Sequence, residues 1–288
     1  MTRFGLALSL FIMSGALAAT PAKAMIGDKD IARLVSFGGA CNKCDLSGRR
    51  LTNARFSGAN FAGASLVNAD LRGASFIHSS FQGARLMNAD LRGAEIVASD
   101  FTAANFSNAA LDGVEAPRAS FVRAKLTNVS ARGAELPGAN LSFADLSSAR
   151  FTGAGLVGAR LLHADGRGAD FADAELTGAM LVSGRFDGAS FRGADLDRAM
   201  LTGASFAGAD FRGASLDGAI LAGANLSGAR NLRQSQLDDA CGDDRTRLPS
   251  GLKIKACGNR RTIIMRETMI PAPPAPPAPP KAAPPPPK

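Results

Sequence analysis

Cysteine and histidine carry the most reactive side chains of this sequence. Cys41 and Cys44 enclose two residues, a spacing that occurs in thiol–disulfide oxidoreductases and in zinc sites. A catalytic Cys-x-x-Cys motif needs a βαβ context, with its first thiol at the N-terminus of a helix. The remaining cysteines and the histidines stand far apart in the sequence: His78, His163, Cys241 and Cys257. Whether any of these groups can react therefore depends on the elements that position them.

Those elements follow a single period of five residues. From Leu46 to Leu226, every fifth residue is Leu, Phe or Ile at 34 of 37 positions; the exceptions are Ala116, Ala131 and Gly166. Two residues before these centres, Ala occupies 30 of the 37 units, and the departures are Cys44, Arg49, Ser79, Ser99, Val114, Val129 and Gly184. A period of five fits neither an α-helix nor a strand. The backbone must therefore turn once in every unit.

Units such as Ala69-Asp70-Leu71-Arg72-Gly73 and Ala209-Asp210-Phe211-Arg212-Gly213 resemble those of the pentapeptide-repeat family, over about two thirds of the chain. The resemblance implies an all-β fold, a right-handed quadrilateral β-helix with four units in each coil. At the usual strand spacing of ~4.8 Å, about nine coils make a rod of roughly 45 Å. Each coil is stable only against its neighbours, so both ends need caps.

With four units per coil, residues twenty positions apart stack on one side of the rod. This predicts two ladders of inward phenylalanines on different sides, which consist of Phe61, Phe81, Phe101 and Phe121, and of Phe151, Phe171, Phe191 and Phe211. The small centres Ala116, Ala131 and Gly166 lie where the ladders change sides. We expect an under-filled core and the least regular coil there.

The outward positions form charged columns. Arg72, Arg92, Arg132, Arg192 and Arg212 share one column, and Asp70, Asp90, Asp170 and Asp210 flank it. Acidic residues also follow the next side: Glu95, Glu115, Glu135, Glu175 and Asp195. Adjacent acids and bases favour a self-neutralising, solvated ladder, because the acids cancel most of the field that an arginine stripe would need to bind an anionic polymer.

One outward column is apolar. Met180, Met200 and Ile220 project from one side, with Leu162 and Val182 nearby. A contiguous apolar strip is either covered by the chain itself or is an interaction surface. The apolar stretch from Leu248 to Cys257 is the expected cover, and an interaction surface is the alternative.

The length of the rod limits how the four cysteines can pair. Bridged Cα atoms lie within ~7 Å, so bonds between the two ends are excluded unless the tail doubles back fully. We predict that Cys41 pairs with Cys44 and Cys241 with Cys257. The first pair falls at inward positions, which favours structural links over redox chemistry, and a four-thiolate zinc site is excluded by the same distance. The two histidines point outward on different sides, so no metal site or nucleophile–base pair follows.

The two ends of the chain differ from the repeats. A basic start, an apolar run from Phe4 to Ala19 and the small-residue pattern Ala22-Lys23-Ala24 predict a signal peptide over residues 1–24. An N-terminal cap over 25–43, with a helix at 28–39, would precede the solenoid of 44–230. A C-terminal cap over 231–262, with a helix from Ser235 to Ala240, and a disordered Pro-rich tail over 263–288 would follow it. The tail would act as a spacer or as a basic tether to an anionic envelope surface.

Charge and context narrow the function. From Asp45 to Arg230 there are 18 basic and 18 acidic residues, so the body is neutral and no nucleic-acid partner is expected. The predictions are a secreted or periplasmic, non-catalytic scaffold without cofactors, a monomer or weak homodimer that binds an unknown protein or envelope component. No transmembrane segment remains after signal removal. The resemblance implies an alternative, a DNA mimic that binds type II topoisomerases, which the signal peptide and the neutral body disfavour; a thiol–disulfide redox protein is a third possibility.

Overall fold

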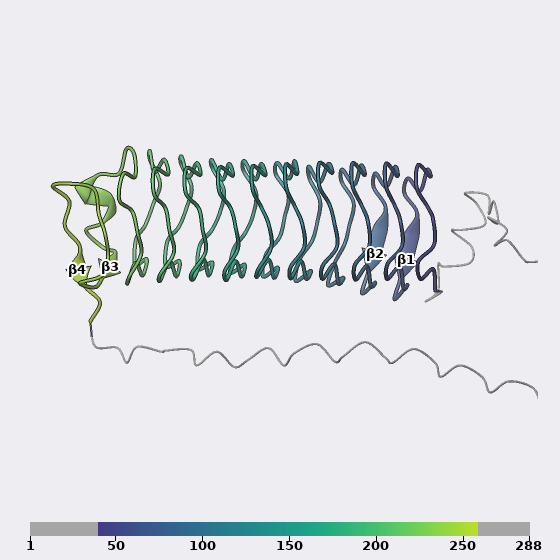
Figure 1. The fold of residues 1–288 in the computed structure, drawn as a ribbon, viewed down its shortest axis with the longest axis horizontal. Helices are drawn as coiled ribbons and strands as arrows, with labels where there is room; N and C mark the ends of the chain where they lie inside the picture. The colour runs from purple at the N-terminus through teal and green to yellow at the C-terminus, as the bar shows by residue number, and fades with distance from the viewer. Residues whose placement is uncertain (1–39, 259–288) are drawn as a thin grey trace, which may run out of the picture.

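The computed structural model of this protein describes residues 40–258. The predicted signal peptide, the helix at 28–39 and the Pro-rich tail lie outside the described residues. The described chain winds into a straight rod of stacked coils (Figure 1). Parallel bridges join residues twenty apart without a break, from Ala40↔Asn60 to Asp210↔Arg230. The expected right-handed β-helix with four units per coil is therefore confirmed.

Backbone hydrogen bonds between coils hold the rod together. Around Asp90, for example, Leu71 N–H donates to the Asp90 carbonyl at 2.7 Å, and Asp90 N–H donates to the Ala69 carbonyl at 3.0 Å. Each corner needs one residue in the left-handed region, such as Gly73 with a φ of 63° or Asn88 with a φ of 56°. Glycine and asparagine reach this region at little cost, which explains why they recur at the last position of the unit.

Each coil has four sides, which we number by their residues. Side one carries residues 60–63 in an early coil and 220–223 in a late one. Side two runs from 45–48 to 225–228, side three from 50–53 to 210–213, and side four from 55–58 to 215–218. Side four lies next to side one, because the chain passes directly from one to the other.

The inward residues form one continuous hydrophobic core. Phe61, Phe81, Phe101 and Phe121 stack on side one, with ring centroids 4.8 to 5.3 Å apart. Phe151, Phe171, Phe191 and Phe211 stack on side three at 5.3 Å. In each ladder, every phenylalanine ring stacks nearly parallel on the equivalent ring of the adjacent coil, so the same stabilising contact repeats along the axis of the rod.

The expectation of an irregular coil at the small centres is wrong. Ala116, Ala131 and Gly166 each donate the same 2.7 Å hydrogen bond to the next coil as their neighbours do. In the units of Ala116 and Ala131, the usual Ala two positions earlier is replaced by a buried valine, Val114 or Val129. The larger valine side chain offsets the volume lost at the small centre of the same unit.

The space at Gly166 is filled by the ring of Phe186 in the next coil. A Cβ at Gly166 would lie 2.5 Å from Cδ1 of Phe186, and a Cβ at Gly184 would also collide with that ring. The two glycines therefore make room for one phenylalanine, and the core stays filled.

The coils depart from the regular pattern elsewhere, at two buried serines. Ser79 and Ser99 occupy positions that are usually Ala. The Ser99 hydroxyl accepts from Ser79 N–H at 2.9 Å and donates to the Phe76 carbonyl at 2.6 Å. It therefore bridges the two backbone groups that bond directly at an ordinary corner. The Ser79 hydroxyl likewise accepts from Ala59 N–H. The short strands β1 (Arg55–Ser57) and β2 (Ser75–Ile77) precede the corners at Ala59 and Ser79, whose N–H groups donate to the two serine hydroxyls.

The C-terminal end closes the core. A short 3-10 helix, η1 (Gln234–Gln236), stands where a longer helix from Ser235 to Ala240 was expected, and that expectation is wrong. Gln236 Nε2 donates to the carbonyls of Phe211 and Ala214 at 2.9 and 2.7 Å. The side chain thus provides these two backbone carbonyls of the last coil with hydrogen-bond donors. Leu237 is buried and completes the core.

Two further strands extend the stack at this end. β3 (Cys241–Gly242) continues from Ile220, and β4 (Lys255–Ala256) pairs in parallel with β3. The expectation that Leu248 to Cys257 covers the apolar strip is therefore wrong. Its apolar residues pack on the end of the core, because the last coil would otherwise expose both its core and its strand edges: Leu248, Leu252 and Ile254.

Candidate interaction surfaces

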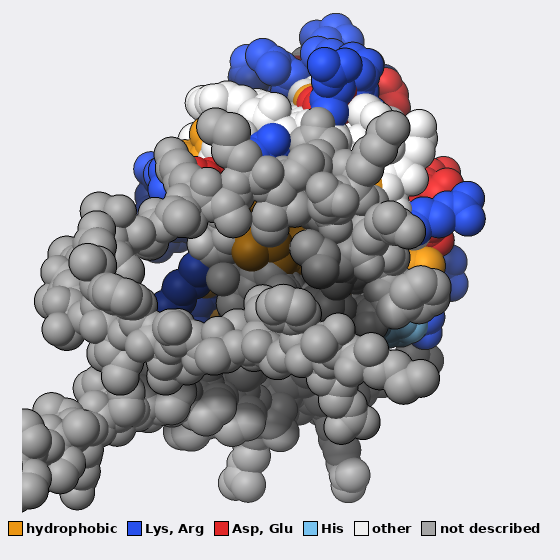
Figure 2. All heavy atoms as spheres, turned by 90° about the vertical axis from the view of Figure 1, so that its right-hand side faces the viewer, with side chains coloured by type: hydrophobic (Ala, Val, Ile, Leu, Met, Phe, Trp, Pro, Cys, Tyr) orange, Lys and Arg blue, Asp and Glu red, His pale blue; other side chains and the backbone are white. Residues whose placement is uncertain are grey.

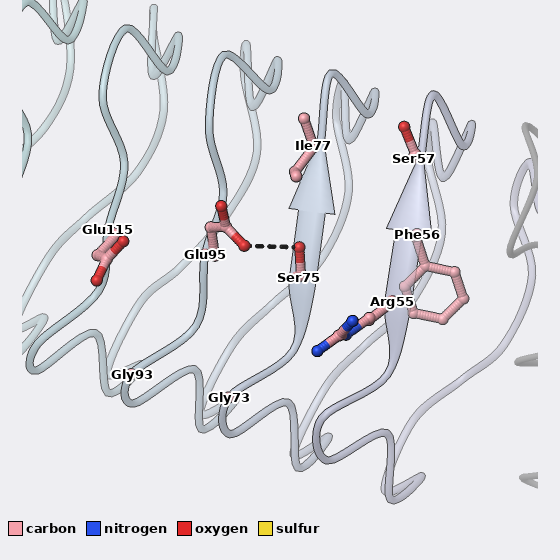
Figure 3. A pocket seen from close by; sticks show the side chains of 9 residues that line it. All are labelled: Arg55, Phe56, Ser57, Gly73, Ser75, Ile77, Gly93, Glu95 and Glu115. Atoms are coloured by element: carbon pink, nitrogen blue, oxygen red, sulfur yellow. Dashed lines mark hydrogen bonds between the residues drawn. The ribbon is translucent and has the colours of Figure 1, made fainter.

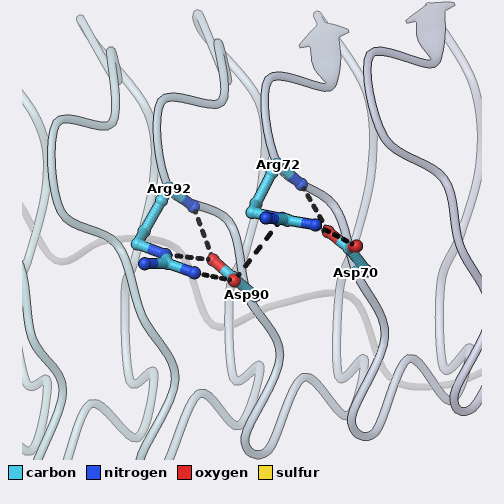
Figure 4. A network of polar contacts seen from close by, with 4 residues as sticks. All are labelled: Asp70, Arg72, Asp90 and Arg92. Carbon is cyan, nitrogen blue, oxygen red and sulfur yellow. Dashed lines mark hydrogen bonds and ion pairs between the residues drawn. The ribbon is translucent and has the colours of Figure 1, made fainter.

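Side three carries a network of ion pairs. The Arg72 guanidinium donates to both oxygens of Asp70 at 2.8 Å, and Arg92 does the same to Asp90 at 2.8 and 2.6 Å (Figure 4). Arg72 also lies 3.7 Å from Asp90, which links the two coils. These hydrogen bonds lower the pKa of Asp70 and of Asp90. Seen along the rod, basic and acidic side chains project from the rim next to one another (Figure 2). The arginines of this network are thus neutralised locally.

Side four is the acidic side of the rod. Between residues 55 and 218 it carries seven acidic and three basic residues. Near the N-terminal end it contains an open groove of about 590 Å³, lined in part by Arg55, Ser75, Glu95 and Glu115 (Figure 3). Ser75 Oγ donates to Glu95 at 2.9 Å. The groove lies beside β1 and β2, where the buried serines alter the corners, and its charged groups are of both signs.

Side one carries the apolar strip predicted from the repeat. Met180, Met200 and Ile220 are joined by consecutive backbone bridges, and their side chains are half-buried. Leu162 and Val182, two positions further along the same side, are also half-buried. From Leu161 to Gly223, side one contains no Asp, Glu, Lys or Arg. The strip therefore differs from the charged sides in two ways, because its outward residues are apolar and it carries no charged side chain.

An exposed aromatic ladder borders this strip and was missed in the sequence. Phe143 is 43% exposed, and its ring stacks on His163 with centroids 4.9 Å apart. The Arg123 guanidinium lies 5.7 Å from the Phe143 centroid on the other side. Phe143 has a φ of 60°, and it is the only phenylalanine of the described residues in that region. Its place in the repeat, where Gly and Asn predominate, was a signal that could have identified it.

A buried hydroxyl lies beside Phe143 in the sequence. Ser142 is fully buried, and its Oγ has no hydrogen-bond partner among the described residues. Val122 and Leu162 occupy the equivalent positions of the two adjacent coils. A buried hydroxyl without a partner costs stability, so this residue is not explained by the packing of the rod alone.

The cysteines lie at the two ends. Cys41 and Cys44 form a disulfide with Cα atoms 5.3 Å apart, and Cys241 and Cys257 form another with Cα atoms 4.7 Å apart. Cys41 is only 7% exposed and donates its N–H to the Asn60 carbonyl of the next coil. No helix begins at this motif, so the structure places it in a coil rather than in a redox-type fold.

The second disulfide stands next to a carboxylate with a strongly lowered pKa. Burial alone would raise the pKa of Asp243, but hydrogen bonds from Gly223 N–H, Arg245 and Thr246 lower it to about 2. The bond from Gly223 is 2.6 Å long and ties the C-terminal extension to side one of the last coil. Asp243 is therefore a structural anion at this end.

Metal sites and membrane spans are not found in the described part of the chain. Between residues 40 and 258, no group of three or more His, Cys, Asp and Glu could hold a metal ion. His78 lies on side four and His163 on side one. Over the same range, no helix has the length and apolar composition of a membrane-spanning segment.

A family model and several solved structures match this chain. The family model of pentapeptide repeats matches eight times, and together the matches span residues 41–181 and 185–241. Among solved structures, HetL, a pentapeptide-repeat protein involved in heterocyst differentiation regulation in Nostoc sp. strain PCC 7120, is 28% identical over 75% of this chain and 95% of its own, with a TM-score of 0.40. QnrB1, a plasmid-mediated fluoroquinolone resistance protein, is 18% identical over 79% of this chain and 96% of its own, with a TM-score of 0.27. A protein from the Arabidopsis thaliana thylakoid lumen is 21% identical over 76% and 81%, with a TM-score of 0.15. No curated protein matches the sequence.

Proposed function

Because the chain belongs to the pentapeptide-repeat family, we propose that it is a non-catalytic scaffold that binds a partner protein through one side of a rigid rod. Export to the periplasm or the cell exterior is part of this proposal. The apolar run from Phe4 to Ala19, followed by the small-residue pattern Ala22-Lys23-Ala24, supports export, and the two disulfides suit an oxidising compartment.

The observation that carries this proposal is the exposed Phe143. A large apolar ring at a corner loses contact with water only when something binds over it, and aromatic residues are the usual anchors of protein interfaces. Its left-handed backbone is unfavourable for a bulky residue, so the position is costly for folding alone. His163 and Arg123 hold the ring in one orientation, which reduces the entropy lost on binding.

The test is photo-crosslinking in the expressing cell. Benzoylphenylalanine placed at Phe143 should yield a discrete adduct with one partner protein. The same probe at Arg118, an exposed corner residue with a φ of 56° on side four, serves as the matched control. Absence of an adduct at Phe143, or the same adduct from both positions, would contradict binding through side one.

Export is tested separately. Cell fractionation followed by N-terminal sequencing should find the protein outside the cytoplasm, with a mature N-terminus near Met25. A cytoplasmic protein that retains residue 1 would remove this part of the proposal and leave the binding surface untouched.

The two alternative functions receive less support. A DNA mimic would need a strongly acidic rod, whereas residues 45–230 contain equal numbers of acidic and basic side chains. A gyrase supercoiling assay tests that alternative. A redox role would need an accessible thiol, whereas Cys41 is buried and paired; an insulin-reduction assay tests this one.

A further inference from the structure

The apolar strip of side one, which we define as Leu162, Met180, Val182, Met200 and Ile220, lacks a cover among the described residues. We propose that residues 259–270 of the same chain, Asn-Arg-Arg-Thr-Ile-Ile-Met-Arg-Glu-Thr-Met-Ile, fold back along this strip. The proposal concerns a contact within the chain and is independent of the partner site at Phe143.

The first support is the place where the described chain ends. Ile220 bridges to Cys241, and Cys241 pairs with Lys255, so β4 lies in line with the methionines of the strip. Cys257 N–H then donates to the Gly242 carbonyl at 2.9 Å, which keeps the chain on side one up to its last described residues. The described chain therefore ends two strand steps beyond Ile220, at the end of the strip.

The second support is length. Five steps between neighbouring strands separate Lys255 from the coil of Leu162, a distance of about 24 Å at the usual spacing of ~4.8 Å. An extended segment of twelve residues spans about 40 Å at ~3.3 Å per residue. Residues 259–270 can thus reach every residue of the strip, and Ile263, Ile264 and Met265 fall within that reach.

The third support is the size of the strip. Four coils at ~4.8 Å and three residues at ~3.3 Å give an area of about 200 Å². A stable interface between two folded proteins buries about 800 Å² on each partner. The strip is therefore too small to hold a second copy by itself, whereas it matches one extended chain that lies along the rod.

The fourth support is charge. Residues 259–270 contain three arginines, Arg260, Arg261 and Arg266, against one acid. Asp197 and Asp217 of side four lie three residues before Met200 and Ile220, at the corner that adjoins the strip, where Arg198 is the one basic residue, so this corner carries a net negative charge. Apolar side chains of the segment would lie on the uncharged strip, while its arginines face the acidic corner.

The backbone of the strip limits how tightly the segment is held. Met200 N–H already donates to Ala179, and the Met200 carbonyl accepts from Leu181. The contact consequently depends on side chains.

Methionine oxidation measures this cover directly, because sulfoxide formation by hydrogen peroxide follows the exposure of the sulfur. Met180 and Met200 are read by peptide mass spectrometry against Met87, a half-buried methionine on side two that serves as the internal reference. In a chain that ends at Gly258, the oxidation rates of Met180 and Met200, each divided by that of Met87, should be several-fold higher than in the full chain. A chain that ends at Ile270 should behave like the full chain.

A substitution variant keeps the length unchanged. Ile263→Asp/Ile264→Asp should also accelerate oxidation of Met180 and Met200, whereas the control Ala272→Asp/Ala275→Asp in the Pro-rich region should not. Equal oxidation rates in the full chain and in the chain that ends at Gly258 would overturn the proposal. Protection that survives truncation but disappears on dilution would assign the strip to a second copy and would overturn it as well.

Discussion

The interior of the rod and its outer surface share one backbone but are occupied in different ways. Inside, Leu, Phe, Ile and Ala alternate with little variation, and exceptions are compensated by neighbours, as Phe186 compensates Gly166. Outside, the same coils carry ion pairs on side three, acids on side four and an uncharged strip on side one. The repeat therefore constrains the inward positions, while the outward positions are free to differ between sides. Function is to be sought where an outward residue departs from the column around it, as Phe143 does.

The largest expected effect is in the interior. Phe186→Ala should lower the free energy of unfolding by about 3 to 5 kcal/mol, because it leaves a cavity and also exposes the space at Gly166 and Gly184. The loss should exceed that of Phe106→Ala on the same side, where no glycines adjoin the ring. Thermal or denaturant unfolding measures both.

A double variant sharpens this test. Gly166→Leu alone should destabilise the rod, since its side chain would collide with Phe186. In the Phe186→Ala background it should instead recover part of the loss. Additive effects of the two substitutions would show that the residues do not share one space.

The two ends should respond differently to loss of their disulfides. Cys241→Ser/Cys257→Ser opens a link across sixteen positions and should cost about 3 kcal/mol, whereas Cys41→Ser/Cys44→Ser opens a link across only three and should cost less. Unfolding curves of the two double variants give the comparison. A larger loss at the N-terminal pair would contradict it.

The C-terminal extension should be sensitive to acid. The pKa of Asp243 is about 2 in the folded chain, below its ordinary value of 3.8. Its carboxylate therefore stabilises the fold above pH 3.8, and this contribution is lost as the pH falls from 3.8 towards 2. In Asp243→Asn the stability should be lower at neutral pH and should fall less across this window. An unchanged pH profile would exclude Asp243 as the group responsible.

Two buried serines should show opposite signs. Ser142→Ala removes a hydroxyl without a described partner and should raise the free energy of unfolding by about 1 kcal/mol. Ser99→Ala removes a hydroxyl that bonds Ser79 and Phe76 and should lower it by a similar amount. Destabilisation by both substitutions would mean that the Ser142 hydroxyl has a partner after all.

The smallest effect is expected on side three. Arg72→Ala should change the free energy of unfolding by less than about 0.5 kcal/mol, since exposed ion pairs contribute little and salt screens them. A loss comparable to that of Ser99→Ala would show that the network does more than neutralise its own charges.

Much of the fold could be predicted because the repeat is strict. The period of five identified the inward centres, and the twenty-residue coil implied by the family resemblance placed the Phe61 and Phe151 ladders and put Met180, Met200 and Ile220 in one column. The error at Gly166 arose because the compensating ring of Phe186 stands twenty residues away, in the next coil. The errors at Ser235 and Leu248 arose outside the repeat, where no period constrains the path of the chain.

The sequence by itself determined the five-residue period and the inward residues, because an apolar centre recurs in every unit. The side on which each outward residue lies followed from the four units per coil that the resemblance to the pentapeptide-repeat family implies. The tertiary structure decided how adjacent coils fill one another's gaps and how the hydroxyls of Ser79 and Ser99 bond the corners at Ala59 and Ser79. It also decided that β4 continues the stack at the end of side one. These outcomes depend on contacts between residues that are close only after the coils have stacked, and no local pattern encodes them.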